Sequence, residues 1–136
     1  MAHKDRRNWK TWQAKRPDEP FTPITESMRK SPAYRSLNAK QRDLLILCWI
    51  QGNPKARGNA HLPRDDFPNV DKFKHENVFY MCRNKAVQDN IYTSTNRRYY
   101  DDMDVLEKCG FIEKIEQGHK GTQSIYKLSC RWQNYK

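Results

Sequence analysis

The segment that decides the fold lies at positions 94–129. It reads STNRRYYDDMDVLEKCG at 94–110, FIEKIE at 111–116, GHKG at 118–121 and SIYKLS at 124–129. The first piece has the apolar spacing of a helix and ends in a glycine, whereas the second and the fourth are rich in strand-forming residues. We therefore expect a helix that leads directly into a two-stranded ribbon with a basic tip.

Both ends of this helix carry recognisable signals. Ser94 can accept hydrogen bonds from the first free backbone amides of the next turn, so we expect the helix to begin near Thr95 or Asn96. Gly110 should end it, because a glycine just past the last turn adopts the left-handed conformation that other residues resist. Lys108, in the last turn, complements the negative end of the helix.

One face of the helix is expected to be buried. Tyr99, Met103 and Leu106 recur at helical spacing, which predicts an apolar stripe with Asp102 and Cys109 on its margins. Residues on this stripe are therefore core candidates, and the opposite face is left for solvent or a partner.

The exposed face carries side chains suited to reading DNA. Arginine and asparagine form paired hydrogen bonds with guanine and adenine edges, and the first turns of a recognition helix reach deepest into the major groove. The predicted DNA-binding residues at this helix start are Ser94, Thr95, Asn96, Arg97, Arg98 and Asp101.

The ribbon supplies a second candidate contact. Strand formers predict strands at 111–115 and 125–128, and residues 118–121 tolerate the positive φ of a hairpin loop. His119 and Lys120 would stand at the tip of the hairpin and contact a phosphate or the adjacent minor groove.

The first half of the chain contains another strong helix. Asn38 caps it, positions 44–50 are almost entirely apolar, and the Gly-Asn-Pro at 52–54 breaks it. We expect this helix at the centre of the core. Ser31 and Pro32 open a short helical turn before it, with Ser31 as the cap and the proline in the first position.

A strand and a short helix are expected between these two helices. Residues 78–81 predict a strand that joins the ribbon in a three-stranded sheet. A short helix that buries Ala86 and Val87 is expected at 84–88, or at 83–88, and a turn at 91–93. The order helix, strand, helix, helix, strand, strand predicts an α+β fold of the winged helix-turn-helix type.

Composition favours a polyanionic partner. The 136 residues include 26 Lys and Arg against 16 Asp and Glu, a net charge of +10. Such a chain is attracted to nucleic acid. It has no apolar run near the ~18 to 20 residues that span a bilayer, and its basic start has no apolar signal core. We expect a cytoplasmic protein that binds double-stranded DNA and no membrane.

The compact domain is expected at 21–132. Residues 1–20 predict a flexible basic arm, residues 53–77 a long connection rich in proline and charge, and residues 133–136 a tail. The arm either follows the DNA backbone or is a solvated tail. Its candidate phosphate contacts are Lys4, Arg6, Arg7 and Lys10.

Catalysis and metal binding have little support in the sequence. There is no glycine-rich phosphate loop, no paired-carboxylate motif and no nucleophile motif. The four cysteines and the histidines are isolated, which predicts buried or half-buried thiols and no metal site. We expect a protein that is not an enzyme and needs no cofactor.

A family resemblance narrows the function. The pattern FTPIT at 21–25, SPAY at 31–34, GFI at 110–112 and YKLS at 126–129 resembles small winged helix-turn-helix proteins of Gram-positive plasmids, phages and integrative elements. The resemblance covers roughly 21–132. It implies sequence-specific DNA binding by an accessory factor in replication or conjugative transfer, or by a transcription regulator, as a monomer, as a homodimer or with proteins encoded by the element.

Two alternatives remain at this level. Arg97 and Arg98 could be a solvated face that forms ion pairs with Asp101 and Asp102. The chain could also be a protein–protein interaction module of a nucleoprotein complex that binds through an acidic helix flank. That flank consists of Asp101, Asp102, Asp104 and Glu107.

Overall fold

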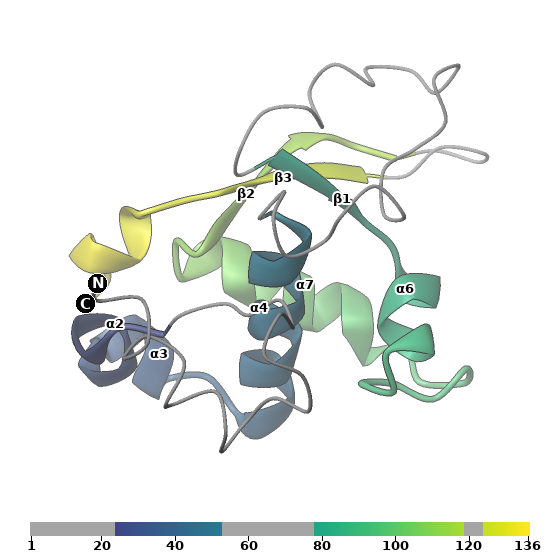
Figure 1. Cartoon of the computed structure of the whole chain (residues 1–136), viewed down its shortest axis with the longest axis horizontal. Coiled ribbons are helices and arrows are strands. Elements are labelled where there is room, and N and C mark those ends of the chain that lie inside the picture. The colour runs from purple at the N-terminus through teal and green to yellow at the C-terminus, as the bar shows by residue number, and fades with distance from the viewer. Residues whose placement is uncertain (1–23, 53–77, 119–123) are drawn as a thin grey trace, which may run out of the picture.

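The computed structural model describes residues 24–52, 78–118 and 124–136. Over these ranges the chain is a mixed α+β structure with five α-helices, one 3-10 helix and a three-stranded antiparallel sheet (Figure 1). α2 and α3 lie at one end of the molecule and α6 at the other, with α4 and α7 between them. The predicted α+β class is therefore confirmed.

Two short helices open the described chain. α2 (Glu26–Lys30) is capped by the side chain of Thr25. α3 (Pro32–Arg35) is capped by Ser31, whose Oγ accepts a hydrogen bond from the backbone N–H of Tyr34 at 3.2 Å. The predicted cap and first-position proline of α3 are confirmed. α2 was not predicted, because none of its five residues is buried and it has no apolar stripe.

α4 (Ala39–Gln51) is the central helix. Its start is a capping box: Asn38 Oδ1 accepts from the N–H of Gln41 at 2.8 Å, and Gln41 Oε1 accepts from the N–H of Asn38 at 2.9 Å. Its end at position 51 agrees with the predicted break. Its buried residues are Leu44, Leu45, Leu47, Cys48, Trp49 and Gln51.

The next elements follow in the predicted order. β1 (Val78–Met81) has the predicted bounds, and α6 (Arg83–Gln88) starts at the earlier of the two positions considered. Ala86 is fully buried, whereas Val87 is only half-buried. α7 (Arg98–Lys108) begins later than the sequence predicted and ends where it predicted.

Gly110 turns the chain from α7 into the sheet. Its φ is +90°, and its carbonyl accepts a hydrogen bond from the N–H of Trp132 at 3.1 Å. A Cβ at this position would lie 2.5 Å from that backbone nitrogen. The predicted left-handed glycine is confirmed, and its role extends to the packing of the C-terminal segment.

The ribbon strands are β2 (Ile112–Glu116) and β3 (Ser124–Leu128). β2 starts one residue later than predicted. Phe111, just before it, is fully buried and stacks on Trp132 with ring centroids 6.2 Å apart. The register shifts between Lys114 and Glu116, which marks an irregularity in β2.

The sheet has the strand order β1-β3-β2. β1 pairs with β3, so that Phe79 lies opposite Tyr126 and the two rings stack 5.7 Å apart. The prediction that residues 78–81 join the ribbon in one sheet is therefore confirmed. The last element, η4 (Arg131–Asn134), straddles the predicted domain end at 132.

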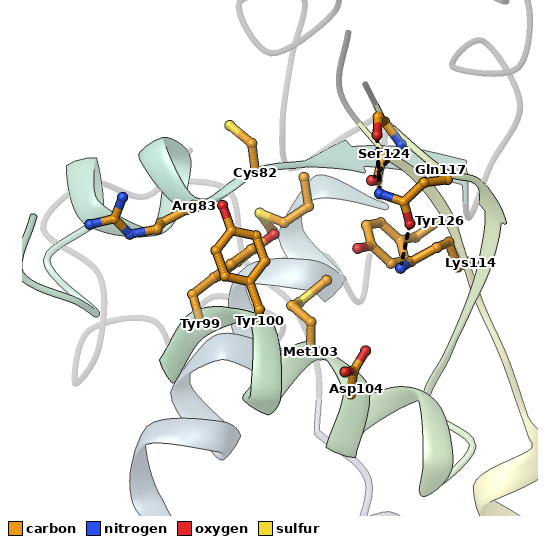
Figure 2. A pocket seen from close by; sticks show the side chains of 12 residues that line it. Cys82, Arg83, Tyr99, Tyr100, Met103, Asp104, Lys114, Gln117, Ser124 and Tyr126 are labelled. Carbon is orange, nitrogen blue, oxygen red and sulfur yellow. Dashed lines mark hydrogen bonds between the residues drawn. The ribbon is translucent and has the colours of Figure 1, made fainter. Parts of the chain in front are cut away.

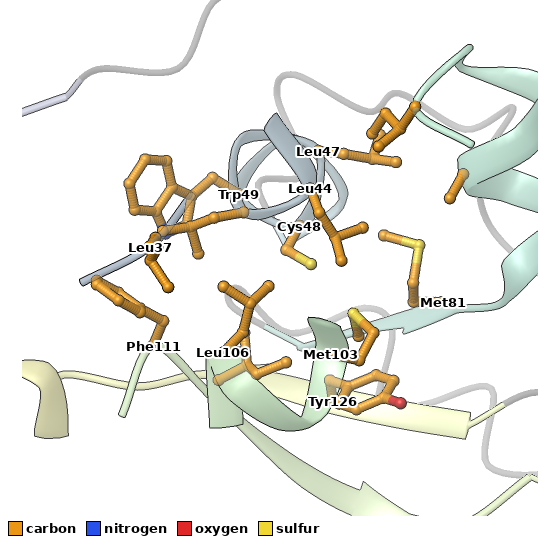
Figure 3. Packing of buried hydrophobic residues seen from close by; sticks show 14 of the residues in the cluster. Leu37, Leu44, Leu47, Cys48, Trp49, Met81, Met103, Leu106, Phe111 and Tyr126 are labelled. Atoms are coloured by element: carbon orange, nitrogen blue, oxygen red, sulfur yellow. The ribbon is translucent and has the colours of Figure 1, made fainter. Parts of the chain in front are cut away.

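The core lies between α4, α7 and the sheet (Figure 3). Tyr99, Met103 and Leu106 are buried, as their spacing predicts. Asp102 and Cys109 were predicted on the margins of this stripe, but both are buried at 4% exposure. The margin assignment was wrong, because helices and loops from the first half of the chain also cover this side of α7.

Candidate nucleic-acid interface

α7 begins at Arg98 because the residues before it form a turn. The N–H of Asn96 donates to the carbonyl of Thr93 at 3.1 Å, and the side chains of Ser94 and Thr95 are exposed on this turn. The predicted cap by Ser94 was wrong. The side chain of Asn96 takes its place, since Asn96 Oδ1 accepts from the N–H of Arg98 at 2.9 Å.

Asn96 is held from a second side. Its backbone carbonyl accepts a hydrogen bond from Nε of Arg83, the first residue of α6, at 3.1 Å. A bidentate contact to adenine uses the amide oxygen and nitrogen together, and here the oxygen is already engaged. In this conformation Asn96 fixes the start of α7 and joins it to α6.

Arg97 and Arg98 are exposed at this start. The alternative in which they pair with Asp101 and Asp102 is not formed, because the ion pairs between described residues involve other side chains. Asp102, four residues after Arg98, faces the core. Both guanidinium groups are therefore available to a partner, as far as the described residues are concerned.

Asp102 organises a buried polar network. Its Oδ2 accepts from the hydroxyl of Tyr92 at 2.6 Å, and its Oδ1 accepts from Nε2 of Gln41 at 3.1 Å. Burial and the neighbouring Asp102 carboxylate raise the pKa of the Tyr92 hydroxyl above its ordinary value. The network ties the capped start of α4 to the turn before α7 and to α7 itself.

Lys40 reinforces this connection. Its Nζ donates to the carbonyl of Ile91 at 3.0 Å and lies 5.1 Å from the centre of the Tyr92 ring. Sequence reasoning missed this lysine and the network it supports. The one available signal was the position of Asp102, three residues after Tyr99 and next to Met103 on the buried stripe.

The acidic flank of α7 is smaller than the sequence indicates. Asp102 is buried, and Glu107 Oε2 accepts from the backbone N–H of Lys114 at 2.9 Å. Only Asp101 and Asp104 of the four carboxylates are exposed. The surface on which the protein-interaction alternative depends is therefore reduced to two exposed charges.

A pocket of about 460 Å³ lies beside α7, between the β1–α6 junction and the end of the ribbon that leads into its connecting loop. Tyr99 and Tyr100 point from α7 toward the chain around Cys82, and Lys114 and Gln117 lie on the ribbon side (Figure 2). Lys114 Nζ donates to Gln117 Oε1 at 3.0 Å. No pattern in the sequence pointed to this pocket.

The remaining predicted contacts cannot be placed. His119 and Lys120 at the hairpin tip lie outside the described residues, as does the connection at 53–77. The same holds for the four basic residues of the arm, Lys4, Arg6, Arg7 and Lys10.

The thiols are unlike one another. Cys48 and Cys109 are buried, Cys82 is half-buried, and burial raises the pKa of Cys48. Cys130 is exposed, so the prediction of buried or half-buried thiols was wrong at this position, just past the end of β3. Within the described ranges, no three His, Cys, Asp or Glu side chains gather as metal ligands would.

Comparison with known proteins identifies no family. No protein-family model, no curated protein and no solved structure matches the chain. In the described part of the chain, every helix is too short or too polar to cross a membrane.

Proposed function

We propose that this chain is a winged helix-turn-helix protein that binds double-stranded DNA sequence-specifically. The order α4, β1, α6, α7, β2, β3 and the strand order β1-β3-β2 support this fold. In such a protein α6 and α7 form the helix-turn-helix, and the β2–β3 ribbon is the wing. α7 would enter the major groove with its N-terminal end.

The observation that carries the proposal is that Arg97 and Arg98 are exposed and form no ion pair with a described residue. Both are exposed at the start of a helix whose opposite face is buried, and no described carboxylate neutralises either of them. The turn that presents them is braced by Asn96 and by the Asp102 network. A rigid helix start with two free guanidinium groups suits paired hydrogen bonds to guanine.

The neighbouring residues have supporting roles in this proposal. The exposed hydroxyls of Ser94 and Thr95 are placed to contact phosphates, and Asp101 can accept a hydrogen bond from a cytosine amine. Asn96 acts mainly by fixing the helix start. Further phosphate contacts, on either side of those made by α7, would come from Lys120 and His119 at the wing tip and from the basic arm.

The biological process is proposed from the family resemblance. It suggests an accessory factor in replication or conjugative transfer of a mobile element, or a transcription regulator. Such a protein would act in the cytoplasm, as a monomer, as a homodimer or together with other proteins of the element. A binding role without catalysis or cofactor suits these functions. The protein-interaction alternative has the weaker support, since α7 exposes only two of its four flanking carboxylates.

The test is a binding experiment on the double variant Arg97→Ala/Arg98→Ala. A preferred sequence is first selected from random duplexes with the full chain, and its affinity is then compared with that for random duplex by fluorescence anisotropy. Each lost paired contact is expected to remove about 1 to 3 kcal/mol of discrimination, so the preference should fall about 10-fold or more.

The matched control is Arg29→Ala/Lys30→Ala. It removes two exposed cations from α2, at the end of the molecule away from α6, where they pair with Glu26. This variant should keep the preference for the selected sequence. If both double variants kept the preference, or if the wild-type chain bound all duplexes alike, the recognition role of α7 would be refuted.

A further inference from the structure

We propose that the pocket beside α7 binds a nucleotide, as an aromatic base together with its phosphate. The base could belong to an unpaired stretch of a DNA strand or to a free nucleoside monophosphate. The strand source rests on the proposed DNA-binding function, whereas the free nucleotide does not.

The size and lining of the pocket fit an aromatic ligand. Its volume of about 460 Å³ lies in the range of small-molecule sites. Tyr100 lines it with a side chain that is 58% exposed, one of the few large apolar groups left open to solvent among the described residues. An exposed ring beside a cavity offers a face on which any base can stack.

Tyr99 supplies an unsatisfied polar group in the wall. Its side chain is only 2% exposed, and its hydroxyl makes no hydrogen bond with any described residue. Its ring meets that of Tyr100 edge to face, with the centroids 5.2 Å apart (Figure 2). Buried hydroxyls nearly always have a partner, and a ligand in this pocket would supply the one that the described residues do not.

Charged groups surround the aromatic wall. Arg83 also lines the pocket, but its guanidinium points away from Tyr99 and Tyr100, and its Nε donates to the carbonyl of Asn96 (Figure 2). Lys114 stands on the ribbon side of the pocket. The Lys114 ammonium suits a phosphate, whereas Asp104 can accept a hydrogen bond from an exocyclic amine. Adenine, cytosine and guanine are therefore favoured over thymine.

The experiment uses the fluorescence of 2-aminopurine, which is quenched when the base stacks on an aromatic ring. The full chain is titrated into a single-stranded oligothymidine that carries one 2-aminopurine, and separately into 2-aminopurine deoxyriboside monophosphate. Saturable quenching is expected in at least one arm. Quenching in the oligonucleotide arm alone identifies a DNA strand as the source, and quenching by the monophosphate identifies a free nucleotide.

Three variants locate the binding. Tyr100→Ala removes the stacking face and should weaken binding by about 5- to 100-fold. Tyr99→Phe removes one oxygen and should weaken it less, whereas Asp104→Asn should reduce the preference for amine-bearing bases over thymine. Ile24→Ala, which shortens another exposed apolar side chain outside the pocket, should leave affinity unchanged.

The outcomes separate this inference from the proposed function. No saturable quenching, or quenching that Tyr100→Ala and Tyr99→Phe leave unchanged while both variants unfold cooperatively, overturns the pocket assignment even if duplex binding is intact. Quenching that depends on Tyr100, in a chain with no preference among duplexes, retains the pocket and rejects sequence-specific duplex recognition.

Discussion

Three tyrosines near the start of α7 show how surroundings decide the role of one residue type. Tyr92 is buried and its hydroxyl donates a hydrogen bond to Asp102, Tyr99 is buried with no hydrogen-bond partner among the described residues, and Tyr100 is exposed. Burial raises the pKa of the first two. Removing each hydroxyl should therefore change the free energy of unfolding by amounts that differ in sign as well as in size.

Tyr92→Phe should destabilise the fold. It removes a 2.6 Å hydrogen bond and leaves one oxygen of the buried Asp102 without its donor. Losing one partner of a buried charged group costs about 1 to 3 kcal/mol of unfolding free energy. Urea unfolding at neutral pH measures this loss, with Tyr100→Phe as the control because its side chain is exposed. Equal stability of both variants would show that the Asp102 network does not support the helix start.

Tyr99→Phe should stabilise the protein in the absence of ligand. The substitution keeps the buried ring and removes a hydroxyl that has no partner among the described residues. Removing an unsatisfied buried hydroxyl should raise the free energy of unfolding by about 1 to 3 kcal/mol. The melting temperature from calorimetry should rise. A lower melting temperature would mean that the hydroxyl is hydrogen-bonded in the folded protein and would remove one support of the nucleotide pocket.

At the scale of elements, the join between α7 and β2 fixes the position of the ribbon. Gly110 holds a left-handed φ, and its neighbour Phe111 is buried against Trp132. The backbone N–H of Lys114 in β2 is bound by Glu107 of α7. The angle between the proposed recognition helix and the proposed wing is therefore set by short contacts within a few residues of the join.

Gly110→Ala should be strongly destabilising. A left-handed φ alone costs a residue with a Cβ roughly 1 to 2 kcal/mol, and the new Cβ would also lie 2.5 Å from the backbone nitrogen of Trp132. The loss of unfolding free energy in urea should exceed that range. Gly52→Ala is the matched control, because its φ is −81° and its Cβ would lie 2.8 Å from the side chain of Leu128, with the nearest backbone atom, the Cys48 carbonyl oxygen, at 3.3 Å. A larger loss at position 52 would contradict this account of the join.

At the scale of the whole molecule, the buried tyrosines make stability depend on alkaline pH. Burial raises the pKa of Tyr126 from 10.0 to about 12, and the pKa values of Tyr92 and Tyr99 are raised as well. The unfolded chain therefore releases these protons at lower pH than the folded chain. The resulting stability is complete below about pH 10 and is lost as pH rises through the folded pKa.

The unfolding free energy should fall between pH 10 and pH 12. For Tyr126 a shift from 10.0 to about 12 corresponds to roughly 2 to 3 kcal/mol. Urea unfolding at pH 8, 10, 11 and 12 measures the fall. Tyr126→Phe keeps the ring and lacks the proton, so its stability should fall less over the same interval. A wild-type stability that stays constant from pH 9 to 12 would contradict the buried state of these hydroxyls.

The sequence alone determined the order of elements and several of their bounds. β1, the capped start of α3, the Asn38 cap of α4 and the turn at Gly110 all follow from signals that act within a few residues. The buried stripe of α7 also follows, because helical spacing is a local property. Arg97 and Arg98 lie off this apolar stripe and are exposed, as the same helical spacing predicts.

Only the tertiary structure decided how the candidate site is held. Asp102 turns inward because Gln41, 61 positions earlier in the chain, and Tyr92 both donate to it. Asn96 replaces Ser94 as the support of the helix start because Arg83 and the turn fix its position. The pocket with Tyr99 exists only where β1, α7 and the ribbon meet. Local spacing predicts which face of a helix is apolar, but a buried polar partner comes from a distant segment, and its position is set by packing.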